Sequence, residues 1–120
     1  MKILSPKVHG YLDFVVVIAF ALAPTIFGLT GLAATIAYVL AVVHLALTLL
    51  TAFPLGVVGL VPFTIHGWIE LLVSVGLVAL PFIAGFSDVP VARNFYIAAG
   101  VVVFGVWLVT NYKAAETATT

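Results

Sequence analysis

The sequence predicts an all-α fold: a four-helix transmembrane bundle made from two tandem, parallel helix-hairpin repeats. Three observations lead to this prediction. The chain has 120 residues, of which 65% are hydrophobic and 7% charged, whereas a soluble domain has about 25% charged residues. Four apolar runs each reach the ~20 residues that a helix needs to cross a bilayer. A segment of the first run also recurs in the third run.

The four apolar runs extend over about residues 7–29, 32–53, 62–86 and 91–112. Turn-forming residues at 30–31 separate the first two runs, and those at 87–90 separate the last two. The segment 54–61 contains one proline and two glycines, so we expect it to form a loop in the membrane interface. Residues 113–120 form a short polar tail.

The recurring segment reads HGYLDFVVVIAFALAPTIFG over residues 9–28 and HGWIELLVSVGLVALPFIAG over residues 66–85. Two spans separate the copies, so they have the same orientation, with a pseudo-twofold axis along the membrane normal. We expect a single integral membrane domain over 1–120, with repeat 1 at about 7–53 and repeat 2 at about 62–112. The matched residues are His9 with His66, Gly10 with Gly67, Asp13 with Glu70, Pro24 with Pro81, Gly28 with Gly85 and, allowing two extra residues in the second turn, Thr51 with Thr110.

Each copy has an aromatic residue and an acid near its start, a proline about one turn before its end, and then glycine. This pattern resembles the SPW-repeat family of small bacterial and archaeal membrane proteins. The resemblance covers about residues 9–112, although the Ser-Pro-Trp tripeptide is replaced by residues 23–25 (APT) and 80–82 (LPF). It implies a prokaryotic membrane protein with this fold, and no particular chemistry.

Several classes of function are excluded by composition. The net charge is zero, so no basic surface indicates nucleic acid, and without cysteine there are no disulfides, thiol catalysis or Fe–S clusters. We see no Ser-His-Asp arrangement, phosphate loop or nucleotide fingerprint and therefore assign no catalytic residues. The expected partners are the lipid bilayer and a second copy of the chain, since so apolar a small bundle suggests a homodimer.

The positive charges predict the orientation. Four spans put both chain ends on one side, with Lys2, Lys7 and Lys113 there and Arg93 on the other. The positive-inside rule then predicts a multi-pass protein of the cell membrane with both termini in the cytoplasm. Aromatic residues near the predicted span ends fit interfacial anchors: Tyr11, Trp68, Tyr96 and Tyr112.

Ionisable groups inside a span are costly, at roughly +2.5 to +3.5 kcal/mol for a central Asp or Lys. From the helical rise, His9 and His66 lie ~5–6 Å from the membrane edge, the two acids ~10–12 Å and His44 ~14 Å, all in the cytoplasmic half. Residues four apart share a helix face, so each histidine faces its own acid. The stripe of Ala37, Ala41, His44 and Thr48 on the second run is predicted to face inward, because small residues allow close helix packing. The candidate site is therefore His9, Asp13, His44, His66 and Glu70.

Three interpretations of this site remain open. The histidines and carboxylates could bind a divalent metal such as Zn²⁺, Mn²⁺ or Fe²⁺, or relay protons. Alternatively, the pairs only satisfy one another in a non-catalytic structural or accessory subunit. A third possibility is b-type haem with His9 and His66 as axial ligands. Against haem, the two acids lie where an apolar macrocycle would sit.

Overall fold

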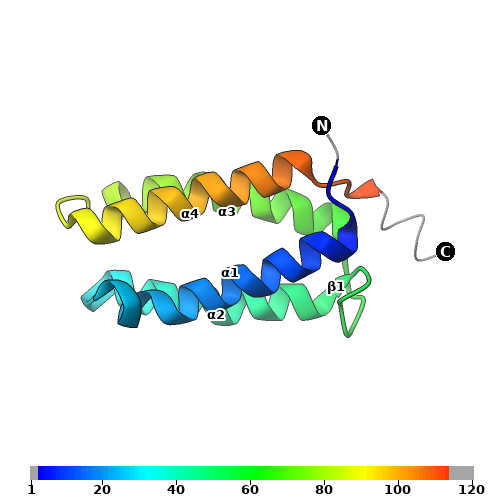
Figure 1. The fold of residues 1–120 in the computed structure, drawn as a ribbon, viewed down its shortest axis with the longest axis horizontal. Coiled ribbons are helices and arrows are strands. Elements are labelled where there is room, and N and C mark those ends of the chain that lie inside the picture. The colour runs from blue at the N-terminus through cyan, green and yellow to red at the C-terminus, as the bar shows by residue number, and fades with distance from the viewer. Residues whose placement is uncertain (1–2, 114–120) are drawn as a thin grey trace.

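In the computed structural model, which describes residues 3–113, the chain forms helices joined by short turns and two short strands (Figure 1). The predicted tail lies outside the described residues except for Lys113. The elements are α1 (Pro6–Phe27), α2 (Gly31–Leu50), β1 (Thr51–Ala52), β2 (Val61–Pro62), α3 (Phe63–Ile83) and α4 (Pro90–Val109).

Each of these four helices is long and apolar enough to cross a membrane, which is compatible with a multi-pass membrane protein. The all-helical prediction is confirmed at this level. Each helix ends two or three residues before the corresponding apolar run. For α2 and α4 the reason is visible at Thr51 and Thr110, where the backbone becomes extended, with ψ of 140° and 137°.

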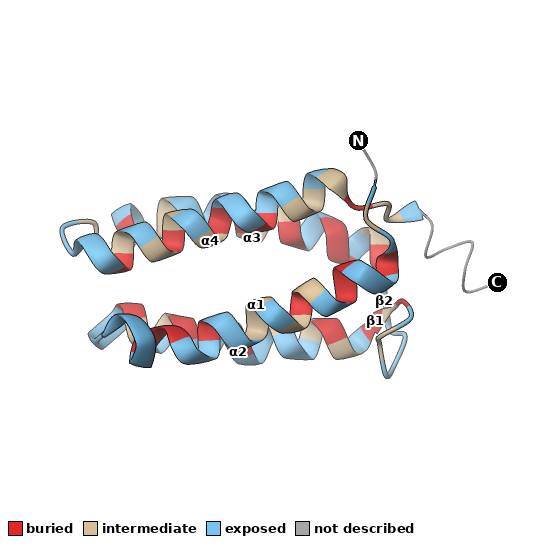
Figure 2. Cartoon of the chain, viewed as in Figure 1, coloured by how far each residue is buried: buried red, intermediate tan, exposed pale blue. Residues whose placement is uncertain are grey.

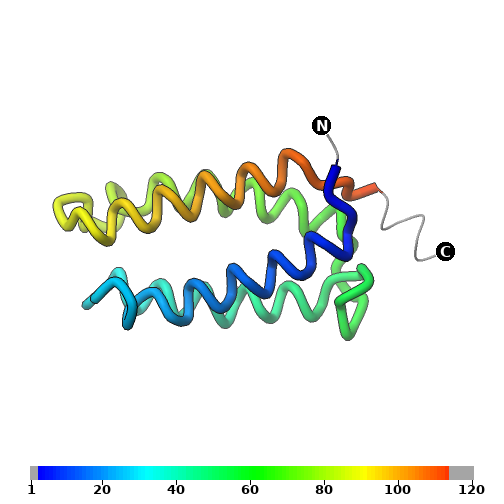
Figure 3. Tube along the Cα trace, viewed as in Figure 1, coloured from blue at the N-terminus to red at the C-terminus, as the bar shows by residue number. Residues whose placement is uncertain are grey.

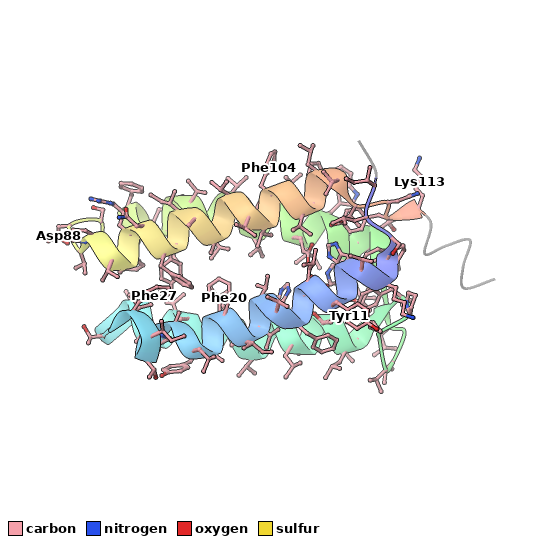
Figure 4. The ribbon with its side chains drawn as sticks, in the orientation of Figure 1. Tyr11, Phe20, Phe27, Asp88, Phe104 and Lys113 are labelled. Atoms are coloured by element: carbon pink, nitrogen blue, oxygen red, sulfur yellow. The ribbon has the colours of Figure 1, made fainter. Side chains whose placement is uncertain are left out.

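The helices pack mainly as α1 against α2 and α3 against α4, and the helices of each pair run in opposite directions (Figure 1). Both described chain ends lie at one end of the molecule (Figure 3). We call this the polar end, and the opposite end, where Asp88 lies (Figure 4), the turn end.

Two backbone pairings join the helix pairs at the polar end. Strand β1 pairs in parallel with β2, with Thr51 opposite Val61. Leu4 forms an isolated parallel bridge with Thr110, because the Leu4 N–H donates to the Val109 carbonyl and the Asn111 N–H to the Leu4 carbonyl, both at 2.9 Å. The start of α1 is thereby tied to the end of α4, and the start of α3 to the end of α2.

The outward faces of the helices are largely exposed and apolar, as a bilayer requires (Figure 2). Ala37, Ala41 and Thr48 are buried, so the predicted inward stripe on α2 is confirmed. Tyr96 is fully buried and its hydroxyl donates to the Ala33 carbonyl at 2.6 Å. The prediction that Tyr96 is an interfacial anchor was therefore wrong: its hydroxyl finds its partner inside the protein instead of at the headgroups.

Candidate metal centre

The His–acid pairs of α1 and α3 have the geometry that their spacing predicts. His9 Nε2 lies 3.1 Å from Asp13 Oδ1, and His66 Nε2 lies 2.8 Å from Glu70 Oε1. All four residues are buried. One helical turn separates each histidine from its acid, so both side chains project from the same face of their helix.

The two pairs also contact each other across the helix interface. His9 Nε2 lies 2.9 Å from Glu70 Oε2, and His66 Nε2 lies 3.2 Å from Asp13 Oδ2. One ligand atom from each of the four residues falls within 4.8 Å of the others. Residues 57 positions apart in the sequence thus form one compact group, which we call the four-ligand group.

His44 reaches the edge of this group from α2. Its Nε2 lies 3.4 Å from Asp13 Oδ1 and 3.9 Å from Glu70 Oε1, so His44 lies level with the two acids, as the helical rise predicts. Its side chain is 13% exposed, whereas those of His9 and His66 are fully buried. All five candidate residues are therefore brought together, with His44 as the outermost member.

Two threonines fix the orientation of the inner imidazoles. His9 Nδ1 lies 2.8 Å from Thr110 Oγ1, and His66 Nδ1 lies 2.7 Å from Thr51 Oγ1. Each threonine donates its only hydroxyl hydrogen to the carbonyl four residues earlier, at Val106 or Leu47. The hydroxyl oxygen can therefore only accept from the histidine, so both Nδ1 atoms carry hydrogen. Each Nε2 is then directed at the carboxylates.

Several polar atoms at the centre lack a hydrogen bond despite their close neighbours. Among the described residues these are His9 Nε2, Asp13 Oδ2 and His44 Nε2. A buried polar atom without a hydrogen bond costs about 1–3 kcal/mol. With neutral imidazoles, the Nε2 atoms of His9 and His66 and the carboxylates are all acceptors facing one another, an arrangement that needs a cation or added protons.

Two occupants would balance the charge. Two carboxylates and two neutral imidazoles match the charge of one divalent metal ion, and Nδ1-protonated histidine offers its Nε2 lone pair as a ligand. Alternatively, protonation of both histidines gives two cations and two anions, with the Nε2–H groups donating to the carboxylates. The donor set fits a first-row transition metal, because imidazole and carboxylate both bind such ions.

Aromatic side chains close the centre on the side of the polar end. Phe63 is 1% exposed, and its ring centroid lies 5.2 Å from that of His9, 5.0 Å from that of Phe53 and 4.7 Å from that of Tyr112. We call Phe53, Phe63 and Tyr112 the aromatic cap. It separates the buried imidazoles from the solvent at this end.

Tyr112 also takes part in the polar contacts. Its hydroxyl donates to Glu70 Oε2 at 3.2 Å. Burial and the charge of Glu70 raise the pKa of this hydroxyl well above its usual range, so it stays protonated and remains a donor. The sequence predicted only an interfacial anchor here, and the contact with the acid was missed.

Thr51 and Thr110 were likewise not predicted as site residues. Their alignment in the two copies was the available signal, since each follows the helix that packs beside its own repeat's histidine helix. The structure adds that each threonine bonds the histidine of the other helix pair: Thr110 bonds His9 and Thr51 bonds His66.

The site has no space for a haem group between His9 and His66. The His9 and His66 ring centroids are 5.5 Å apart at an interplanar angle of 78°, and both carboxylates contact the Nε2 atoms directly. A macrocycle between the two rings would have to displace Asp13 and Glu70.

No protein-family model matches this chain, and neither a curated protein nor a solved structure matches it.

Proposed function

We propose that the protein is a multi-pass protein of the cell membrane that binds one divalent transition-metal ion at His9, Asp13, His66 and Glu70. The observation that carries the proposal is the convergence of two threonine-oriented Nε2 atoms on two buried carboxylates. Outer partners of this kind fix the tautomer and orientation of metal-ligating histidines in proteins. Metal binding would also satisfy buried polar atoms that lack a hydrogen bond among the described residues, such as His9 Nε2 and Asp13 Oδ2.

The donor separations suit a small ion. Zn–N and Zn–O bonds of about 2.0–2.2 Å place tetrahedral ligands about 3.4 Å apart. The separations of 2.9, 3.1 and 3.2 Å around His9 and His66 need to grow by a few tenths of an ångström, whereas wider separations in the group, which reach at most 4.8 Å, need to shrink. Zn²⁺, Mn²⁺ and Fe²⁺ all accept this combination of imidazole and carboxylate.

The location of the metal follows from the proposed orientation. With both termini in the cytoplasm, the polar end faces the cytoplasm, and the centre lies within the cytoplasmic half of the bilayer. Lys7 and Lys113 belong to this end, whereas Arg93 belongs to the turn end, in keeping with the positive-inside rule.

The two-repeat architecture is part of the proposal and is supported by paired contacts. Leu4–Thr110 and Val61–Thr51 are aligned pairs, and both form parallel bridges. A Cβ added at Gly10 would lie 2.8 Å from the Phe53 ring, and one at Gly67 would lie 2.9 Å from the Tyr112 ring. Equivalent contacts are what a parallel repeat with a pseudo-twofold axis produces. The relation to SPW-repeat proteins, and homodimer formation, stay predictions.

Elemental analysis of untagged protein tests the metal. We expect about one metal ion per chain in the wild type and none in His66→Ala/Glu70→Ala. The matched control is Asp88→Ala, which removes an exposed carboxylate at the turn end and should leave the metal content unchanged. Absence of metal from wild-type protein produced in metal-supplemented medium would contradict the proposal.

A metal-free cluster of ion pairs, acting as a structural element or a proton relay, is the second candidate. It is favoured by the hydrogen bond of 2.8 Å between His66 Nε2 and Glu70 Oε1, which requires a proton on one of these atoms. Metal-free wild-type protein that unfolds at the same denaturant concentration with and without a chelator would support it.

A further inference from the structure

Two of the five clustered residues, His44 and Glu70, border a cavity of about 50 Å³ on the side away from the aromatic cap. His44 and Glu70 form its polar wall, and the other lining side chains are apolar. Val16 and Phe20 follow Asp13 on α1 by one and two turns, and Val73 follows Glu70 on α3. The cavity therefore lies directly beneath the centre, toward the middle of the helices.

All four helices contribute to the walls. Figure 4 shows Phe20 pointing from α1 into the space between the helix pairs, and Leu40 and Val103 belong to α2 and α4. His44 and Val103 occupy equivalent positions, because each lies seven residues before its threonine, Thr51 or Thr110. One copy thus supplies an imidazole where the other supplies an isopropyl group.

The cavity opens toward lipid instead of water. Val43 of α2 and Ile69 of α3 line it and are 56% and 36% exposed. On a membrane-spanning helix such exposed apolar side chains face the acyl chains. At the polar end the aromatic cap and the fully buried imidazoles close the other approach. His44, the partly exposed member of the cluster, is on the open side.

The volume and the apolar lining of the cavity limit which ligands it can hold. A cavity needs roughly 10–15 Å³ to hold one water molecule, and apolar cavities stay dry and accept apolar guests instead. A volume of about 50 Å³ accommodates a diatomic molecule and is too small for a lipid chain. A charged or strongly hydrated ligand would lose its hydration on the way through the bilayer.

We infer that an Fe²⁺ ion held by the four-ligand group keeps a further coordination position on the side of Glu70 and His44, where it takes a small neutral diatomic molecule, such as O₂ or NO, that enters from the lipid between α2 and α3. The inference rests on the proposed metal site. His44 Nε2, which has no hydrogen-bond partner, lies beside that position and can donate to the bound diatomic. The binding step forms one bond between metal and ligand and needs no further reagent.

Nitric oxide on Fe²⁺-loaded protein is the probe. Purified, untagged protein is loaded anaerobically, its iron content is measured, and NO is added while the EPR signal of the iron nitrosyl is followed. Wild type should give this signal. Val73→Phe, which fills the cavity from α3, and Leu40→Phe, which fills it from α2, should keep their iron and lose most of the signal. Val42→Phe adds the same ring to a lipid-facing position of α2 that is 68% exposed, and should behave as wild type.

The possible results distinguish failure of diatomic binding from failure of the metal site. Wild type that holds iron but forms no nitrosyl overturns the inference. So does an iron-loaded Val73→Phe or Leu40→Phe protein that gives the full wild-type signal. Wild type without iron overturns the metal site itself, and the elemental analysis separates this result from the other two.

Discussion

The polar end joins the two helix pairs through hydrogen bonds, whereas the turn end joins them through packed rings and small side chains. At the polar end, His9 and His66 bond threonines of the opposite pair, and two parallel bridges run beside them. At the turn end, the ring centroids of Phe20 and Phe95 lie 5.4 Å apart, and Tyr96 donates one hydrogen bond to α2.

This difference assigns different tasks to the two ends. The turn end only has to keep the pairs together, and apolar side chains and close packing do that in lipid. The polar end holds five ionisable residues whose burial costs free energy unless they are paired or bind a metal. Substitutions at the two ends should therefore differ both in their cost to stability and in their effect on metal binding.

The largest expected effect is at Asp13, whose oxygens lie within 3.4 Å of all three histidines. Asp13→Ala should abolish metal binding and lower the free energy of unfolding by about 3–5 kcal/mol, because it leaves buried imidazoles without their acid. Asp88→Ala at the turn end should change stability by less than about 0.5 kcal/mol. Chemical unfolding in detergent micelles and elemental analysis measure both. Equal losses of unfolding free energy in Asp13→Ala and Asp88→Ala would show that the polar end does not depend on its buried acids.

The second-largest effect is expected at the threonines that orient the imidazoles. Thr51→Val and Thr110→Val should each weaken metal binding about 10–100-fold, the usual cost of losing such a partner of a ligating histidine. Thr48→Val is the matched control, because Thr48 is equally buried and its hydroxyl donates to the His44 carbonyl instead of contacting an imidazole. Competition against a chelator of known affinity gives the values. Identical affinities in Thr51→Val and Thr48→Val would show that the Nδ1 contacts do not orient the ligands.

A smaller effect is expected from the close contact beneath the aromatic cap. A Cβ at Gly67 would lie 2.9 Å from the Tyr112 ring, so Gly67→Ala should displace the tyrosine from Glu70 and cost about 1–3 kcal/mol. Gly76→Ala on the same helix meets nothing within 4 Å and should instead stabilise the protein by about 0.5–1 kcal/mol. The two unfolding midpoints should thus move in opposite directions; a shared direction would argue against tight packing of the cap.

The smallest effect belongs to the turn end. Tyr96→Phe removes the hydrogen bond to the Ala33 carbonyl and should cost about 0.6 kcal/mol, the average for such bonds in a membrane protein. Its metal content should equal that of wild type. Loss of metal in this variant would show that metal binding at the polar end depends on packing at the turn end.

The sequence was sufficient to predict the spans and the members of the cluster. Hydropathy predicts four helices, and the spacing of four residues puts His9 beside Asp13 and His66 beside Glu70. The helical rise predicts that His44 reaches the same depth. These properties depend only on the local geometry of a helix, which the order of residues determines.

The remaining features depend on how separate helices meet. Sequence reasoning placed Tyr96 and Tyr112 at the membrane interface because both lie near span ends, yet one is buried against α2 and the other donates to Glu70. The threonine partners of the histidines lie 101 and 15 residues away in the chain, and the cavity beneath the centre has walls from four helices. Helical periodicity carries no information about such contacts.

X-ray absorption spectroscopy of the purified, untagged protein directly tests whether a metal ion binds to the imidazoles of the polar end. For a zinc-loaded sample we expect one ion per chain, bonded to nitrogen and oxygen atoms at about 2.0–2.2 Å, together with the more distant scattering of two imidazole rings. The imidazole contribution should fall by half in His66→Ala. A sample that takes up no zinc, or whose bound zinc shows no imidazole scattering, would contradict a metal centre at the polar end.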